Sequence, residues 1–183
     1  MLEIIKDKLP ISSSEEYIID NITVDFKGDL FNIYRNENIA KYVARKTHTK
    51  IKDTEEFIEL MRERMKANTN LYLGIYTLSP KKLIGIVRLL KKEEPGILTI
   101  GYALSEEYWG KGIISLAVNS LIPLIKEEGT YSALRATIRE ENINSQRCIE
   151  KMGFKLNGKF KKVDNVQGKE EVESERLLYY KEL

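Results

Sequence analysis

The residue types best suited to chemistry gather in a glycine-rich turn between an apolar strand pattern and an apolar helix pattern. The turn reads Trp109-Gly110-Lys111-Gly112. Glycine has no Cβ, so the chain can turn tightly there and a ligand can approach the backbone closely. The first N–H groups of the following helix have no intrahelical partner and lie at the positive end of its dipole. With the charge of Lys111, these groups are suited to binding an anion; a simple turn is the alternative interpretation.

The residue sequence of this turn excludes two common nucleotide-binding motifs. A Walker A loop requires a glycine five positions before Gly110 and a serine or threonine after the lysine, but Ser105 and Gly112 occupy those places. A dinucleotide fingerprint requires a third glycine, and Ser115 stands at its position. The residues are compatible with a phosphate-binding site of another kind.

A second group of polar residues begins the helix predicted near residues 145–152. Asn142 or Asn144 is a candidate N-cap. Ser145 shares an apolar helix face with Cys148 and Ile149, at spacings of three and four residues. A hydroxyl on such a face requires a hydrogen-bond partner, which either backbone capping or a ligand can supply.

The composition is that of an ordinary soluble globular protein, with 183 residues, 32% charged and 42% hydrophobic. The single cysteine excludes an internal disulfide and a cysteine-cluster zinc site, so we predict no metal and a reducing, cytoplasmic location. No apolar run is long enough to span a membrane, and the N-terminus does not resemble a signal peptide.

The net charge of +2 does not indicate a nucleic-acid partner, and the basic clusters at 45–52 and 159–162 are interpreted as solvated surface. His48 is predicted to lie on the surface, in a loop around residues 42–51.

The elements that must position these residues follow from hydrophobic patterning. Residues 1–15 are predicted to form a loose N-terminal arm, and residues 16–183 a single domain. A short helix bearing Phe26 follows the first strand, with Thr23 or Asp25 as its cap. Asp53 and Glu56 predict the start of an amphipathic helix. A helix follows Gly112, with a kink or an early end at Pro123, and Gly153 closes the last helix. The predicted strands are 17–23, 71–77, 83–90, 97–104, 134–138, 154–162 and 172–180, of which the second to fourth form an antiparallel meander.

Two motifs carry a resemblance to a known family. They are GYALSEEYWGKG at 101–112 and ENINSQRCIEKMGF at 141–154, about thirty residues apart on either side of a helix and a strand. With them, roughly residues 16–183 resemble the GNAT superfamily of N-acetyltransferases, especially the branch of ribosomal-protein and related protein N-terminal acetyltransferases. The resemblance implies a mixed α/β (α+β) fold with about four flanking helices. Its mostly antiparallel seven-stranded sheet is splayed between the fourth and fifth strands.

The resemblance also implies a site for acetyl-coenzyme A. The turn from Trp109 to Ile114 is expected to bind the pyrophosphate through backbone amides, and a bulge in strand 100–104 to open the gap for the pantetheine arm. The implied catalytic groups are a backbone N–H at Leu104, which stabilises the oxyanion, and the Ser145 hydroxyl, which protonates the departing thiolate. The full implied cofactor-binding set is Tyr102, Ala103, Leu104, Trp109, Gly110, Lys111, Gly112, Ile113, Ile114, Asn142 and Ser145.

Some residues depart from the family pattern. Ile114 stands where glycine or alanine is usual and is expected to crowd the pyrophosphate turn. Thr99 stands near a position where some members carry a catalytic glutamate, so no general base is identified. Glu106 and Glu107 are interpreted as exposed turn residues. Tyr102, Tyr108 and Trp109 are candidates for lining the acceptor cleft.

The expected activity is therefore transfer of an acetyl group from acetyl-CoA to a primary amine. A protein N-terminal α-amine is the favoured acceptor, because its pKa of ~8 leaves it partly neutral at pH 7, whereas a lysine near ~10.4 needs more help. A polyamine or an aminoglycoside is the alternative acceptor, and a non-catalytic acyl-CoA-binding or partner-binding module is a third interpretation. The sequence is compatible with a monomer or a homodimer.

Overall fold

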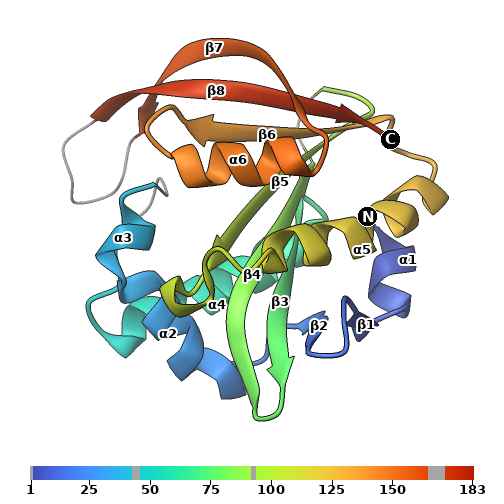
Figure 1. Ribbon diagram of the computed structural model, residues 1–183. Coiled ribbons are helices and arrows are strands. Elements are labelled where there is room, and N and C mark those ends of the chain that lie inside the picture. The colour runs from blue at the N-terminus through green and yellow to red at the C-terminus, as the bar shows by residue number, and fades with distance from the viewer. Residues whose placement is uncertain (1, 43–45, 92–93, 165–171) are drawn as a thin grey trace.

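The computed structural model describes residues 2–42, 46–91, 94–164 and 172–183, which form one twisted sheet with helices on both faces (Figure 1). Among these residues the strands are β1 (Ile11–Ser12), β2 (Tyr17–Asn21), β3 (Asn70–Leu78), β4 (Lys81–Lys91), β5 (Ile97–Leu104), β6 (Ala133–Arg139), β7 (Lys155–Asp164) and β8 (Val172–Glu182). The α-helices are α1 (Glu3–Asp7), α2 (Lys27–Arg35), α3 (Glu37–Ala40), α4 (Ile51–Lys66), α5 (Ile113–Glu127) and α6 (Ile143–Lys151). Two 3₁₀ turns, η1 (Val24–Phe26) and η2 (Glu106–Tyr108), complete the described elements.

The strands lie in the order β1-β2-β3-β4-β5-β6-β8-β7. Every neighbouring pair is antiparallel except β5 and β6, which are parallel. This mixed, mostly antiparallel sheet confirms the predicted fold class. All seven predicted strands are present, and the eighth is the two-residue β1.

The sheet is splayed where the site was expected. β5 and β6 pair only from Ile97 opposite Ala133 to Ile100 opposite Ala136, so the second half of β5 is not paired with β6. The predicted bulge in strand 100–104 is wrong, because the β4–β5 register runs without interruption. The splay has another origin: β5 stays paired with β4 and β6 stays paired with β8 along their lengths, so each half of the sheet follows its own partner.

Side-chain alternation along the strands divides the core into two layers. Ile100 and Leu104 of β5 belong to the layer beneath α5 and α6, together with α1. Ala103 belongs to the second layer, with apolar residues of α2, α3 and α4. The strand that borders the splay therefore contributes to both faces of the molecule.

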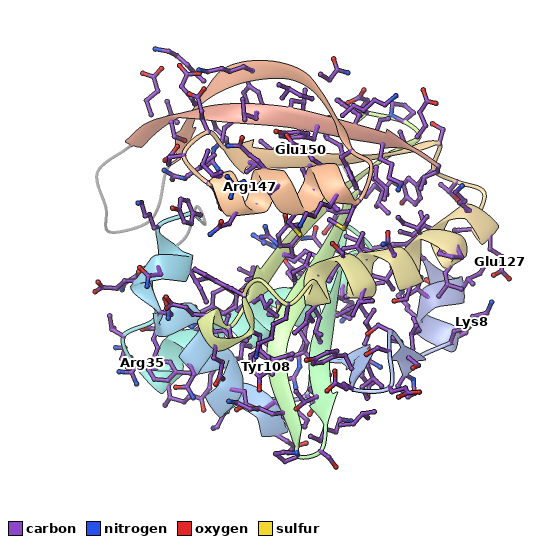
Figure 2. The ribbon with its side chains drawn as sticks, in the orientation of Figure 1. Lys8, Arg35, Tyr108, Glu127, Arg147 and Glu150 are labelled. Atoms are coloured by element: carbon purple, nitrogen blue, oxygen red, sulfur yellow. The ribbon has the colours of Figure 1, made fainter. Side chains whose placement is uncertain are left out.

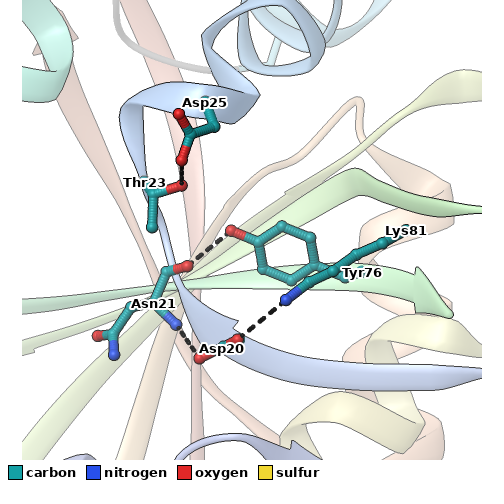
Figure 3. A network of polar contacts seen from close by, with 6 residues as sticks. All are labelled: Asp20, Asn21, Thr23, Asp25, Tyr76 and Lys81. Atoms are coloured by element: carbon teal, nitrogen blue, oxygen red, sulfur yellow. Dashed lines mark hydrogen bonds and ion pairs between the residues drawn. The ribbon is translucent and has the colours of Figure 1, made fainter.

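A polar network fixes the chain where it leaves β2 for η1 (Figure 3). The Tyr76 hydroxyl donates to the Asn21 carbonyl at 2.7 Å, and the Lys81 ammonium lies 3.3 Å from the Asp20 carboxylate. Because Tyr76 and Lys81 come from the β3–β4 hairpin, these bonds tie the end of β2 to that hairpin. α2 then buries Leu30 on its inner face.

The N-terminal arm is not loose, and that expectation is wrong. Leu2 and Ile5 are fully buried, in the core layer beneath α5. Lys8 forms an ion pair with Glu127 at 2.8 Å, and β1 adds to the edge of the sheet beside β2. The segment escapes prediction because a five-residue helix is too short to show an apolar period.

Two other helices differ from expectation. α5 continues past Pro123 to Glu127, so of the two predicted outcomes, a kink or an early end, the early end is wrong. The apolar face of this helix is buried on both sides of the proline, which offsets the lost backbone bond. α4 begins at Ile51, two residues before the predicted start. Asp53 there accepts backbone hydrogen bonds from Thr49 at 2.8 Å and Lys50 at 3.1 Å, which lower its pKa to about 2.

His48 is buried, and the prediction of a surface histidine is wrong. Its side chain is 5% exposed, its Nδ1 lies 2.8 Å from the Thr54 hydroxyl, and its ring packs against Tyr34 and Phe57. The predicted loop around it continues through residues 43–45, which lie outside the described residues. The solvated interpretation of the second basic cluster agrees with the structure, where Lys159 and Lys161 are exposed and paired with Glu140 and Glu173.

Candidate active site

The glycine-rich turn delivers the N-terminus of α5 to the splay. Gly110 and Gly112 adopt φ values of +76° and +74°, a left-handed conformation that side chains with a Cβ rarely take. Gly112 is the N-cap of α5, and the amide of Leu116 makes the first helical bond, to the Gly112 carbonyl at 3.1 Å. The amides of the first helical residues therefore point out of the helix end, as an anion site requires.

Ile114 does not fill this turn. Its side chain is 6% exposed and packs in the core layer beneath α5. The space at the two glycine positions stays open, because a Cβ added at Gly110 or Gly112 would meet no atom within 4 Å. The Ile114 side chain, which is larger than the glycine or alanine usual in the family, therefore packs in the core and does not crowd the turn.

The turn opens into a cleft of about 570 Å³ that lies between β5, the start of α5, α6 and the α3 side. Figure 2 labels one residue from each of two walls, Arg147 on α6 and Tyr108 on η2. The lining residues are Ile39, Tyr42, Tyr102, Ala103, Leu104, Tyr108, Trp109, Gly110, Gly112, Ile113, Ile114, Ser115, Asn142, Asn144, Ser145, Arg147, Cys148 and Lys151. Every predicted cofactor residue is among them except Lys111, whose ammonium lies 5.0 Å from the centroid of the Tyr108 ring.

The register of β5 decides which of its backbone groups face the splay. The amide of Ser105 donates to the Ile84 carbonyl at 2.8 Å, in the same register that sets Ala103 opposite Ile86. Bonded and non-bonded pairs alternate along antiparallel strands, so the backbone groups of Ala103 point to β4. Those of Tyr102 and Leu104 point to the opposite edge, where β6 has diverged. Leu104 thus offers an N–H to a ligand in the gap, whereas Ala103 can only line it.

Trp109 fixes the end of this strand. Its indole N–H donates to the carbonyl of Leu104 at 2.8 Å, and its side chain is 37% exposed. The bond ties the glycine-rich turn to the edge of β5. The candidate anion site at the start of α5 and the backbone amide of Leu104 are therefore held in a fixed relation to each other.

Ser145 meets Tyr102 across the cleft. Their hydroxyl oxygens lie 2.7 Å apart, while the backbone amide of Ser145 is capped by the Asn142 side chain at 3.1 Å. The partner of the hydroxyl is therefore the Tyr102 side chain, which was not predicted from the sequence, and the cap from Asn142 serves the backbone amide instead. Burial raises the pKa of Tyr102 well above its usual value, so its hydroxyl stays protonated at neutral pH.

Cys148 lines the same wall as a neutral thiol. Its sulfur lies 3.9 Å from the Ser115 hydroxyl, and burial raises its pKa. The sequence placed it on the apolar face of the helix but did not assign it to the site.

The two glutamates of η2 are engaged at the surface, as predicted. The carboxylate of Glu106 accepts hydrogen bonds from the side-chain amides of Asn36 at 2.8 Å and Asn38 at 2.9 Å, which hold its pKa below the usual range. Glu107 pairs with Lys82 at 2.8 Å, which lowers its pKa likewise. Because Asn36 and Asn38 belong to the start of α3, Glu106 links the wall that carries Ile39 to the glycine-rich turn.

Several lining residues were not predicted from sequence. Asn144, Arg147, Cys148 and Lys151 recur at helical spacing beside Ser145, so the period of α6 was a usable signal. No sequence signal indicates Ile39 and Tyr42, which reach the cleft only through tertiary packing. Among the lining residues that the structure describes, none is an aspartate, a glutamate or a histidine.

The comparison with protein families agrees with this geometry. Residues 18–155 match the model of the "Acetyltransferase (GNAT) domain". The chain therefore belongs to the GNAT acetyltransferase family, and as an acyltransferase of this family it takes acetyl-CoA as its cosubstrate. None of the helices in the described part of the chain is long and apolar enough to cross a membrane.

A curated relative is the probable N-acetyltransferase YjcK of Bacillus subtilis, which is 31% identical over 109 residues. The match covers 58% of this chain and 60% of that protein, so it spans less than two thirds of the relative.

Three solved structures share the fold. The microcin C7 self-immunity acetyltransferase MccE, in complex with acetyl-CoA and AMP, has a TM-score of 0.82 and 22% identity, with 98% of this chain and 99% of that chain covered. The ribosomal-protein-S5-alanine acetyltransferase of Vibrio fischeri has a TM-score of 0.75 and 23% identity, with coverages of 92% and 94%. The spermidine N-acetyltransferase of Vibrio cholerae, in complex with CoA and spermine, has a TM-score of 0.74 and 16% identity, with coverages of 92% and 96%.

Proposed function

We propose that this chain transfers the acetyl group of acetyl-CoA to the α-amine of a protein N-terminus. The observation that carries the proposal is the meeting of three features in one cleft. They are the open helix N-terminus at Gly112, the unpaired edge of β5 at Leu104, and the hydroxyl pair of Tyr102 and Ser145.

The glycine-rich turn holds the cosubstrate in this proposal. Backbone amides at the start of α5 bind the pyrophosphate, because they are unpaired donors at the positive end of the helix dipole. Arg147 and Lys151 of α6 line the same cleft and add positive charge on the opposite wall. Asn142 contributes mainly by capping α6, which sets the position of Ser145.

The edge of β5 supports the reacting carbonyl. The N–H of Leu104 points into the splay and donates to the oxygen that becomes negative when the amine attacks the thioester carbon. The carbonyl of Leu104 already accepts a hydrogen bond from the Trp109 indole. This bond keeps the backbone at the end of β5 in place.

The hydroxyl pair completes the transfer. As the bond between the acetyl carbon and sulfur breaks, the departing thiolate takes a proton from Ser145, and Tyr102 supplies one to Ser145 through their 2.7 Å contact. The raised pKa of Tyr102 keeps that proton available at neutral pH. The amine loses its own proton to water and Tyr102 takes one back from water, so the proton that the amine releases replaces the one that the thiolate gains.

The acceptor preference rests on the lack of carboxylates among the described lining residues. A polycation such as a polyamine would need acidic partners, and an amine that must lose a proton without a base is best supplied by an α-amine of pKa ~8. The fold shared with a ribosomal-protein-S5-alanine acetyltransferase supports a protein acceptor. The fold shared with a spermidine acetyltransferase keeps a small polyamine as the alternative.

The test begins with calorimetric titration of acetyl-CoA, followed by mass spectrometry of peptides incubated with the protein. We expect binding at micromolar affinity and acetylation of a peptide with a free N-terminus. The control peptide has a blocked N-terminus and an internal lysine. Acetylation of spermine but not of peptides would favour the small-amine alternative, and tight binding without turnover on any amine would favour a non-catalytic module.

A further inference from the structure

The face of β5 opposite α5 carries a cation that the proposed transfer does not use. Arg88 of β4 lies directly across from Gly101 of β5. Opposite residues of an antiparallel pair share a face, and two residues further along that face lies Ala103, which lines the cleft. Along this face of the sheet, the position of Arg88 and Gly101 is therefore the next one after Ala103.

Gly101 makes room for this arginine. A Cβ added at Gly101 would lie 2.7 Å from a terminal guanidinium nitrogen of Arg88, so the guanidinium rests against bare backbone. Any other residue at position 101 would displace it. The glycine thus holds the guanidinium flat against the strand that ends at the proposed oxyanion site.

Arg88 has no partner within the described part of the chain. It is half-buried, yet no hydrogen bond or ion pair joins it to another described residue. The neighbouring arginine on this face is satisfied: Arg135 donates to the Thr99 hydroxyl at 3.1 Å and pairs with Glu94 at 2.6 Å. The nitrogens of Arg88 are not among the buried atoms that lack a partner, so the guanidinium keeps donors that a ligand carboxylate can accept from.

We propose that Arg88 binds a carboxylate of the acceptor, so that acidic protein N-termini are the preferred substrates. This inference rests on the proposed N-terminal acetylation. Strand residues advance by ~3.3 Å each, which sets Gly101 roughly 10 Å from Leu104. An extended peptide spans about the same distance in three residues. An aspartate near the third position then reaches Arg88 when the α-amine lies at the thioester.

The experiment compares peptides that differ only at that position, Ser-Ala-Asp and Ser-Ala-Asn at the head of the same neutral sequence. We expect kcat/KM for the aspartate peptide to be about tenfold higher, the effect of one charge-assisted hydrogen bond, and the difference to appear in KM. Moving the aspartate to the sixth position should remove the preference.

Two variants test the residue. Arg88→Gln should bring the ratio of kcat/KM for the aspartate and asparagine peptides close to one. Arg88→Glu should reverse the charge preference, so that a peptide with lysine at the third position is acetylated faster than the aspartate peptide. Gly101→Ala keeps the arginine but displaces its guanidinium, and is expected to weaken the preference independently. Arg62→Gln is the matched control, because Arg62 lies exposed on α4 beside Glu59, and should retain the full preference.

Equal kcat/KM for the two peptides in the native protein would overturn the acidic-acceptor inference while leaving N-terminal acetylation intact. Preference that persists in both Arg88→Gln and Gly101→Ala would also overturn the assignment to Arg88. A protein that binds acetyl-CoA but acetylates no peptide would overturn both proposals together.

Discussion

Two hydroxyl groups from distant parts of the chain meet in the lining of the cleft. Tyr102 and Ser145 are 43 positions apart in sequence, and their oxygens are 2.7 Å apart. The amide of Ser145 is satisfied separately by Asn142. Removing the serine hydroxyl therefore leaves the helix cap in place, which makes the role of this hydroxyl accessible to a single substitution.

We expect Ser145→Ala to lower kcat by about a hundredfold, the lower end of the range for a general acid, and to leave the Kd for acetyl-CoA nearly unchanged. Steady-state kinetics and calorimetry measure the two quantities. Ser120→Ala is the matched control, since the Ser120 hydroxyl bonds to Ala117 within α5. An equal loss of both quantities, or of neither, would show that the hydroxyl has another role.

The pH profile of the reaction also belongs to the residue scale. The neutral amine reacts, so kcat/KM for an N-terminal peptide should rise with pH through ~8. Burial raises the pKa of Tyr102 above its ordinary value near 10, so the protonated donor persists and no descending limb is expected below about pH 10. A fall in kcat/KM between pH 8 and 9 would contradict the role given to Tyr102.

The sequence predicted some of these residues but not the contacts that they make. The position of Ser145 on an apolar helix face predicted that its hydroxyl needed a partner, and the glycine pair predicted the turn. The identity of that partner depends on how β5 packs against α6, which no local pattern encodes. The register that turns Leu104 toward the gap and Ala103 toward β4 is likewise a property of strand pairing.

At the scale of elements, the N-terminal segment is part of the core. α1 sits against α5, where Ile5 is fully buried beside the helix whose N-terminus is the proposed anion site. We expect Ile5→Ala to lower the free energy of unfolding by about 2 to 5 kcal/mol, the cost of deleting a buried large side chain. Chemical denaturation measures the change.

Leu60→Ala is the control for this substitution, because Leu60 is 38% exposed on α4 and its truncation should cost about 0.5 kcal/mol or less. Equal stability of Ile5→Ala and the native protein would mean that α1 is not held against α5 in solution.

Long elements were predictable and short ones were not. The strands of the meander and α4 carry sustained apolar periods, so their type and approximate bounds follow from the sequence. α1 and β1 are too short to carry a period. At Pro123 a strong local signal does not decide the structure. The proline favours an early helix end, but burial of Leu121 and Ile125 on either side keeps α5 continuous.

At the scale of the whole molecule, the splay divides one sheet into two halves that a bound cosubstrate would bridge. Ligand that binds only the folded protein stabilises it by about 2.7 kcal/mol at a hundred times its Kd. For a chain of this length, that corresponds to a rise in Tm of roughly 5 to 10 °C. We expect this shift with acetyl-CoA in a thermal unfolding assay.

Acetyl-pantetheine is the informative comparison, because it reaches the edge of β5 but carries no pyrophosphate for the turn at Gly112. Its shift at the same concentration should be smaller. Equal shifts for the two ligands would show that the turn contributes no binding free energy, despite its open helix N-terminus.

The bond between Trp109 and Leu104 gives the protein an optical reporter of its own site. Trp109 is the only tryptophan of the chain, it lines the cleft, and its indole N–H donates to the carbonyl of the strand edge. Indole emission responds to the polarity around the ring and to this hydrogen bond. We therefore expect intrinsic fluorescence, excited selectively at tryptophan, to report cosubstrate binding without a label. Stopped-flow mixing can then time that binding against the chemical step.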